Sequence, residues 1–160
     1  MKTMEINKVE AYKKLKTAVE AVLGEEKDPV VWMATLSCLI RDMLDGIYWV
    51  GFYRAEAGGD LAIGPYQGTL ACLRIPKGRG ACGFAVSQVE SVVIPDVEEF
   101  SAHISCDSRS RSEIVVPVKD HDGVVRGVLD IDSDSLGRFD EVDRGFLEDL
   151  VGLMKRLEWD

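Results

Sequence analysis

Apolar side chains recur at helical spacing near both ends of the chain. The first such run stops at Gly24, and glycine commonly ends a helix because it tolerates a left-handed backbone. Asp28 and Pro29 form an N-cap and a first turn ahead of the second run. The third run opens at Asp140, where acidic residues crowd the first turn. The pattern predicts three helices, over residues 11–22, 29–45 and 140–157.

The middle of the chain has a different texture, with short runs rich in β-branched and aromatic residues. The turn residues at 58–60 and 120–123 separate neighbouring runs closely enough to predict hairpins. Strands are predicted over 47–54, from 61 onward, and over 71–75, 92–94, 113–119 and 124–132. Helices at both ends predict an α/β protein of the α+β kind, with a central, mainly antiparallel six-stranded sheet flanked by helices. Because no repeat or linker divides the sequence, we expect one domain over residues 1–160.

The composition narrows the range of partners. The 160 residues include 28 Asp and Glu against 19 Lys and Arg, and the net charge of −9 repels nucleic-acid phosphates and anionic membranes. The longest nearly apolar stretch, 30–40, is far shorter than the ~20 residues that span a bilayer. The first ten residues mix charged and apolar side chains and show no secretion signal. We therefore expect a cytoplasmic protein with no nucleic-acid or membrane partner.

Three of the four cysteines are clustered in the middle of the chain. In a reducing cytoplasm such cysteines are free, catalytic or metal-bound rather than structural cross-links. Cys106 lies in a long polar loop, 96–112, with His103 three residues before it and Arg109 and Arg111 close behind. Nearby positive charge favours the thiolate form, so the sequence predicts a reactive thiol at Cys106.

Two chemistries fit these cysteines. Cys72, Cys82, Cys106 and His103 supply four ligands for zinc, although they lack the close cysteine pairs typical of structural zinc sites. Redox chemistry fits the spacing better, because a sulfenic acid on Cys106 would condense with a second thiol, for which Cys72 and Cys82 are both candidates. Cys38 lies beside the apolar stripe of the second helix, where we expect it to pack without any chemical role.

Residues 78–83 match the G-x-G-x-x-G dinucleotide fingerprint literally. Pro76 and Lys77 interrupt the passage from strand to glycines, and no acidic residue ends a second strand about 20 residues further on. A tight turn into a short helix near 84–88 fits better, with the glycines needed for positive φ or close backbone contact.

Acidic residues alternate with apolar ones in the last predicted strand. Asp130 and Asp132 therefore point to one face, and Leu129 and Ile131 point to the other. Two like charges side by side favour a cation, either a metal such as Mg²⁺ or Ca²⁺ or a substrate ammonium, and a solvated strand edge is the alternative. Glu113 opens the preceding strand and, against an apolar wall, would stay protonated and serve as a general acid.

Aromatic residues gather in the first predicted strand. Aromatic side chains in strands mostly belong to the core, which is our expectation for Tyr48 and Phe52. Trp49 and Tyr53 share one face of the strand and are placed to line a pocket instead.

Six short blocks occur in order over nearly the whole chain and continue into GRFD at 137–140. The blocks are WVGFY (49–53), GPYQG (64–68), GACG (80–83), HISCD (103–107), SEIVVP (112–117) and GVLDIDS (127–133). Together they resemble the free methionine-(R)-sulfoxide reductase family. The fold that this resemblance implies is a GAF domain, in which helices sandwich an antiparallel sheet.

The resemblance also implies a reaction, the reduction of free methionine (R)-sulfoxide by cysteine chemistry. Cys106 is then the nucleophile, Cys72 is the main resolving cysteine, and Cys82 is able to form disulfides with its neighbours. A thioredoxin-type protein resets the disulfide, no metal or cofactor is required, and the protein is expected to form a homodimer.

The same resemblance assigns the substrate site. Glu113, Asp130 and Asp132 surround the substrate, and Trp49 and Tyr53 lie against its methylthio end. Two aspartates suit the α-ammonium of a free amino acid, which a methionine within a protein does not have.

Two other functions use the same fold. GAF domains often sense small molecules, but a sensor does not need three thiols together with a carboxylate cluster. A redox switch that regulates a partner uses the thiols and leaves the carboxylates unexplained.

Overall fold

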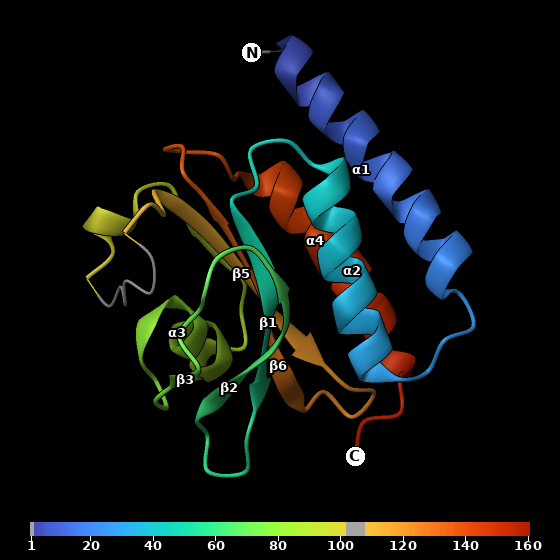
Figure 1. The fold of residues 1–160 in the computed structure, drawn as a ribbon, viewed down its shortest axis with the longest axis vertical. Coiled ribbons are helices and arrows are strands. Elements are labelled where there is room, and N and C mark those ends of the chain that lie inside the picture. The colour runs from blue at the N-terminus through green and yellow to red at the C-terminus, as the bar shows by residue number, and fades with distance from the viewer. Residues whose placement is uncertain (1, 102–107) are drawn as a thin grey trace.

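The computed structural model describes residues 2–101 and 108–160 (Figure 1). The helices are α1 (Lys2–Leu23), α2 (Pro29–Met43), α3 (Gly80–Gln88) and α4 (Glu141–Gly152). The strands are β1 (Trp49–Ala55), β2 (Leu61–Gln67), β3 (Arg74–Ile75), β4 (Val92–Ile94), β5 (Ser112–Lys119) and β6 (Val125–Ser133). Short 3₁₀ turns span Val97–Glu99 and Leu153–Arg156.

The strands form a six-stranded sheet in the order β3-β2-β1-β6-β5-β4, and every neighbouring pair is antiparallel. The central pair places Gly51 of β1 opposite Asp130 of β6. The next pair places Glu113 of β5 opposite Asp132 of β6. The sheet predicted from the sequence is thereby confirmed, and its register brings the predicted acidic residues to neighbouring positions.

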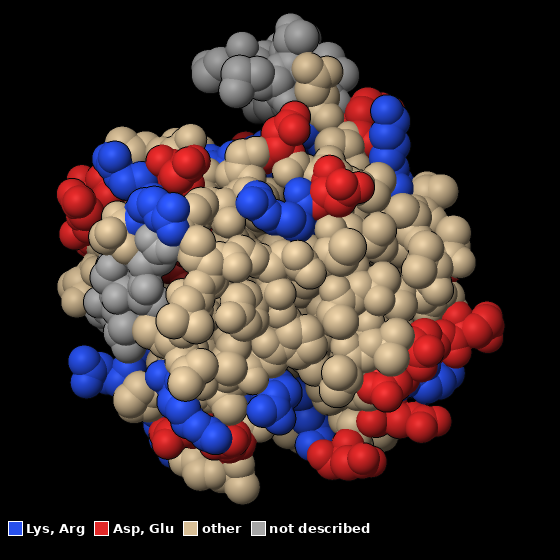
Figure 2. Space-filling model, in the orientation of Figure 1, with Lys and Arg blue, Asp and Glu red and all other residues tan. Residues whose placement is uncertain are grey.

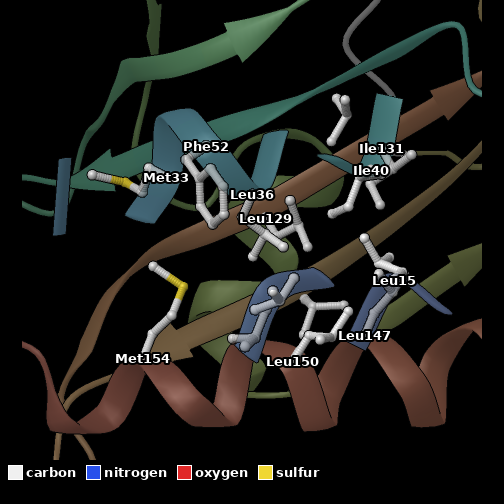
Figure 3. Packing of buried hydrophobic residues seen from close by; sticks show 14 of the residues in the cluster. Leu15, Met33, Leu36, Ile40, Phe52, Leu129, Ile131, Leu147, Leu150 and Met154 are labelled. Atoms are coloured by element: carbon white, nitrogen blue, oxygen red, sulfur yellow. The ribbon is translucent and has the colours of Figure 1, made fainter. Parts of the chain in front are cut away.

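Helices cover both faces of the sheet (Figure 1). α2 and α4 pack on one face and α1 packs on both of them, so that Phe52 and Leu129 of the sheet share one core with Leu15, Leu36 and Leu147 of the helices (Figure 3). The short helix α3 packs on the opposite face, against the side chains that alternate with these. The three-helix face holds the larger cluster of buried apolar side chains, and the α3 face holds a smaller one.

Some element boundaries differ from the predicted ones. α1 begins at Lys2, well before its apolar spacing becomes regular, and α4 ends at Gly152 instead of continuing through Leu157. Leu157 follows a 3₁₀ turn that tightens the helix end and still buries this side chain. The strand expected at 71–75 shrinks to Arg74–Ile75, so that Cys72 precedes it.

A buried ionic cluster joins the two ends of the chain. The last helix begins where the sequence predicts it, and Asp140 caps it by accepting the backbone N–H of Asp143 and that of Val142. Asp143 is fully buried and also accepts Tyr12 Oη at 2.8 Å and Lys8 Nζ at 2.7 Å. The acidic first turn of α4 therefore anchors α1, beyond its favourable effect on the helix dipole.

One face of the molecule carries no charged side chains over a broad central area, and α2 lies in the middle of that view (Figure 2).

Cys38 is exposed on α2, so the expectation that it packs in the core is wrong. The helix turns about 100° per residue, and Leu36 and Ser37 take the buried positions instead. Among the described residues, no helix is both long enough and apolar enough to cross a membrane.

Candidate functional site

A small pocket, with a cavity volume of about 50 Å³, opens on the sheet face that α3 covers. Its walls come from β1, the loop before β3, the N-terminal turn of α3, and strands β5 and β6. They are Tyr48, Trp49, Tyr53, Leu70, Ala71, Ile75, Gly80, Ala81, Cys82, Ser110, Glu113, Asp130 and Asp132. All five residues predicted to hold the substrate therefore line one pocket, together with Cys82.

Strand alternation explains why the acidic residues face the pocket. Asp130 and Asp132 share a face of β6, while Leu129 and Ile131 lie in the three-helix core, as predicted. Glu113 joins them because it lies opposite Asp132 in the β5–β6 register. Only the register of the sheet brings these three carboxyl groups together.

Burial controls the charge of this cluster. Cys82 Sγ and carboxylate oxygens of Glu113 and Asp130 all lie within 4.8 Å of one another. Burial, followed by the nearby Asp130 carboxylate, holds the pKa of Glu113 well above its usual range. Burial, followed by the Asp132 carboxylate, also raises the pKa of Asp130. The pair therefore retains a proton that exposed carboxyl groups would release.

One acceptor in the cluster has no partner. Oδ1 of Asp130 is buried and makes no hydrogen bond to any of the described residues. An unpaired buried acceptor costs about 1–3 kcal/mol, so such an atom at the wall of a pocket points to a donor supplied by a ligand. An ammonium group supplies that donor together with the charge that the carboxylates require.

Asp132 is held at the pocket wall by a residue that the sequence did not single out. Ser110 Oγ donates to Asp132 Oδ1 at 2.7 Å. The backbone on both sides is fixed as well, since Arg111 donates its N–H to Ser133 O at 2.8 Å. A serine in a polar segment carries no pattern of its own, and only the folded structure reveals this contact.

The aromatic residues of β1 line the same sheet face beside the acidic residues, because Trp49 is paired with Asp132 in the β1–β6 register. Trp49 stacks on Tyr53 at a centroid distance of 6.2 Å and on Tyr66 of β2 at 5.3 Å. Gly51 makes this stack fit, because a Cβ atom there would lie 2.2 Å from Tyr66 Cβ and 2.8 Å from the Trp49 ring. The predicted pocket role of Trp49 and Tyr53 agrees with the geometry, and Tyr66 packs on Trp49 without lining the pocket itself.

The same aromatic residues hold the segment that contains Cys72. Trp49 Nε1 donates to Thr69 O at 3.0 Å, and Tyr53 Oη donates to Cys72 O at 3.0 Å. Tyr48 Oη lies 3.1 Å from Thr69 Oγ1. Tyr48 thus lines the pocket instead of belonging to the core, and the three side chains hold the segment of Thr69 and Cys72 against β1.

The cysteines are not equivalent. Cys72 is in a disulfide, whereas Cys38 and Cys82 are free thiols. Burial, followed by the Asp130 and Glu113 carboxylates, raises the pKa of Cys82, which makes it a poor thiolate. The disulfide makes the Cys72 thiol unavailable for a four-ligand zinc site. The predicted nucleophile Cys106, like His103, lies outside the described residues.

The glycine-rich segment turns directly into α3. The helix begins at Gly80, four residues earlier than predicted, and carries Ala81 and Cys82 to the pocket. Gly83 packs against the turn, where a Cβ atom would lie 2.7 Å from the backbone carbon of Gly78. Close backbone packing therefore accounts for this glycine of the motif without a nucleotide.

Known proteins are similar to this chain in both sequence and fold. The GAF domain family model matches residues 30–154. The free methionine-R-sulfoxide reductase of Escherichia coli is 41% identical over 152 residues, covering 95% of this chain and 91% of the relative. The enzyme of that name from Saccharomyces cerevisiae is 38% identical over 157 residues, covering 94% and 87%.

A solved structure extends the likeness to three dimensions. It shows the free methionine-R-sulfoxide reductase of Neisseria meningitidis in complex with its substrate. This chain matches it with a TM-score of 0.86 and 41% identity, covering 91% of this chain and 86% of that one. The chain belongs to the GAF domain family and, within it, to the free methionine-R-sulfoxide reductases.

Proposed function

We propose that this protein reduces free L-methionine (R)-sulfoxide to L-methionine. The observation that carries the proposal is the buried Glu113–Asp130 pair, whose unpaired Asp130 oxygen belongs to the pocket that Trp49 and Tyr53 also line. The acidic end matches an ammonium group, and Trp49 and Tyr53 match an apolar methylthio group. Free methionine sulfoxide carries both groups on one short chain, and the relatives named above support the same substrate.

The reaction needs a nucleophile and an acid. The Cys106 thiolate attacks the sulfoxide sulfur, while the carboxyl group of Glu113 gives its proton to the sulfoxide oxygen. The protonated oxygen then passes from the substrate sulfur to the Cys106 sulfur, so that the S–O bond and the transient S–S contact break, methionine leaves, and Cys106 becomes a sulfenic acid. The substrate gains two electrons, and the cysteine sulfur loses two.

A second thiol completes the cycle. The Cys72 thiol attacks the sulfenic acid, releases water and leaves a disulfide between Cys72 and Cys106. A thioredoxin-type dithiol then reduces this disulfide by exchange, which fits a reducing cytoplasm. The anchoring of Cys72 by Tyr53 Oη supports its role as the resolving cysteine, because it holds that segment at the pocket.

Removal of the substrate's ammonium charge tests the proposed function. N-acetylmethionine (R)-sulfoxide keeps the sulfoxide and the carboxylate but has a neutral amide in place of the ammonium. We expect its kcat/KM to fall at least about 10²-fold below that of the free amino acid, because the buried carboxylates are left without a charged donor. The measurement is methionine or N-acetylmethionine formed with dithiothreitol as reductant. Equal rates for the two compounds would refute the ammonium site.

Replacement of Cys72 by serine separates chemistry from recycling. Cys72→Ser should release about one methionine per enzyme and then stop with thioredoxin as reductant, because the sulfenic acid has no partner thiol. Rapid-quench measurement of methionine gives this stoichiometry. Cys38→Ser is the matched control, since Cys38 is a free, exposed thiol away from the pocket, and it should cycle normally. Full cycling by Cys72→Ser would exclude Cys72 as the resolving residue.

A further inference from the structure

The pocket presents an electrostatic problem for the proposed substrate. Its walls carry Glu113, Asp130 and Asp132, and none of the described residues that line it is Lys or Arg. A free amino acid has an α-carboxylate only about 3 Å from its α-ammonium, so both groups enter together. Acidic walls repel that carboxylate unless a cation lies beside it. A cation at the rim, near the acidic end, would resolve the conflict.

Arg109 is such a cation. Its guanidinium carbon lies 4.8 Å from the centroid of the Tyr48 ring, and Tyr48 lines the pocket. The backbone N–H of Tyr48 donates to Asp132 O at 2.8 Å. Ser110, the residue after Arg109, donates its hydroxyl to the Asp132 carboxylate at 2.7 Å. Two independent contacts therefore place Arg109 at the end of the pocket where Asp132 lies.

The chemistry of arginine suits this position. A guanidinium that stacks on an aromatic ring keeps its N–H groups in its own plane, where they can pair with both oxygens of a carboxylate. Arg109 is exposed, so its guanidinium is accessible from solvent to a ligand that enters the pocket. Stacking on the Tyr48 ring restricts the orientations of the Arg109 guanidinium before a ligand binds, so less side-chain entropy is lost on binding.

We propose that Arg109 binds the α-carboxylate of the substrate and, with the acidic cluster, makes the pocket selective for zwitterionic free amino acids. This inference rests on the proposed reductase function. It adds a charged group at the rim to the carboxylates and aromatic residues within the pocket.

A substrate–enzyme cycle tests the inference. Methionine (R)-sulfoxide amide keeps the ammonium and the sulfoxide but has no carboxylate. Arg109→Ala should raise KM for methionine sulfoxide about ten- to a hundredfold, the range for a lost charged hydrogen bond. For the amide, the same substitution should change KM by less than about twofold. Arg74→Ala, which removes an exposed arginine paired with Glu56, is the control and should leave both substrates unaffected.

The outcomes separate the two claims. If Arg109 acted only by favouring the thiolate of Cys106, the substitution would lower kcat equally for both substrates, and the inference would be overturned. Equal changes in KM for the two substrates would overturn it as well, and would leave the carboxylate to the backbone N–H groups at the start of α3. A wild-type protein inactive on both compounds would instead contradict the proposed function.

Discussion

Cys106→Ser is expected to abolish reduction of methionine sulfoxide, with a loss of about 10³-fold or more in kcat/KM. A serine hydroxyl is not ionised near pH 7 and does not accept oxygen to form a stable equivalent of the sulfenic acid, so neither half of the reaction proceeds. The measurement is methionine released by enzyme in excess over substrate, which detects a single turnover. Unlike Cys72→Ser, this variant should show no burst.

The control for this variant again comes from within the chain. Cys38→Ser removes a free, exposed thiol that lies away from the pocket, and it should retain normal rates. Binding of the product methionine to Cys106→Ser should also be preserved, because the carboxylates and aromatic residues are intact. A normal burst from Cys106→Ser would mean that another thiol performs the attack.

Glu113→Gln is expected to lower kcat by about 10²- to 10⁴-fold, the usual contribution of a positioned general acid. The amide keeps the shape of the side chain and can still donate to Asp130, but it cannot release a proton to the sulfoxide oxygen. Rates measured with dithiothreitol isolate this step from recycling by thioredoxin. Unchanged kcat would show that the acid is a different group.

The same substitution should stabilise the folded protein at alkaline pH. Because burial raises the pKa of Glu113, the folded protein keeps a proton that the unfolded chain releases above its ordinary pKa of about 4.3. This contribution to the free energy of unfolding is complete below that pH and is lost as the pH rises through the raised pKa. Glu113→Gln removes the titration, so its melting temperature should exceed that of the wild type at pH 8.

Melting temperatures between pH 5 and pH 8 provide the test. The advantage of Glu113→Gln should grow with pH and be small or absent at pH 5. Glu20→Gln, at an exposed position of α1, controls for the change in net charge and should follow the wild-type curve. A constant difference at all pH values would indicate that packing, and not ionisation, separates the two proteins.

Local pattern predicts the parts of the site that lie within one strand. Alternation alone places Asp130 and Asp132 on one face of β6 and Trp49 and Tyr53 on one face of β1, and both placements agree with the pocket. The order of the strands is not local information. Glu113 reaches the aspartates because β5 pairs with β6, which no single segment specifies.

The contacts that escape prediction join segments far apart in the sequence. The Ser110–Asp132 and Tyr53–Cys72 hydrogen bonds each link residues about 20 positions apart. The prediction for Cys38 fails for a local reason. One step along a helix separates the buried Ser37 from the exposed Cys38, so a small error in the predicted helix face changes the predicted burial.

The most direct test of the proposed activity follows NADPH consumption with thioredoxin, thioredoxin reductase and racemic free methionine sulfoxide, taken to completion. Consumption should stop at half of the sulfoxide, with only the S epimer left and one methionine formed per NADPH. With the coupling enzymes active and the cysteines reduced, an absence of both NADPH consumption and methionine would contradict it and favour a GAF sensor of small molecules.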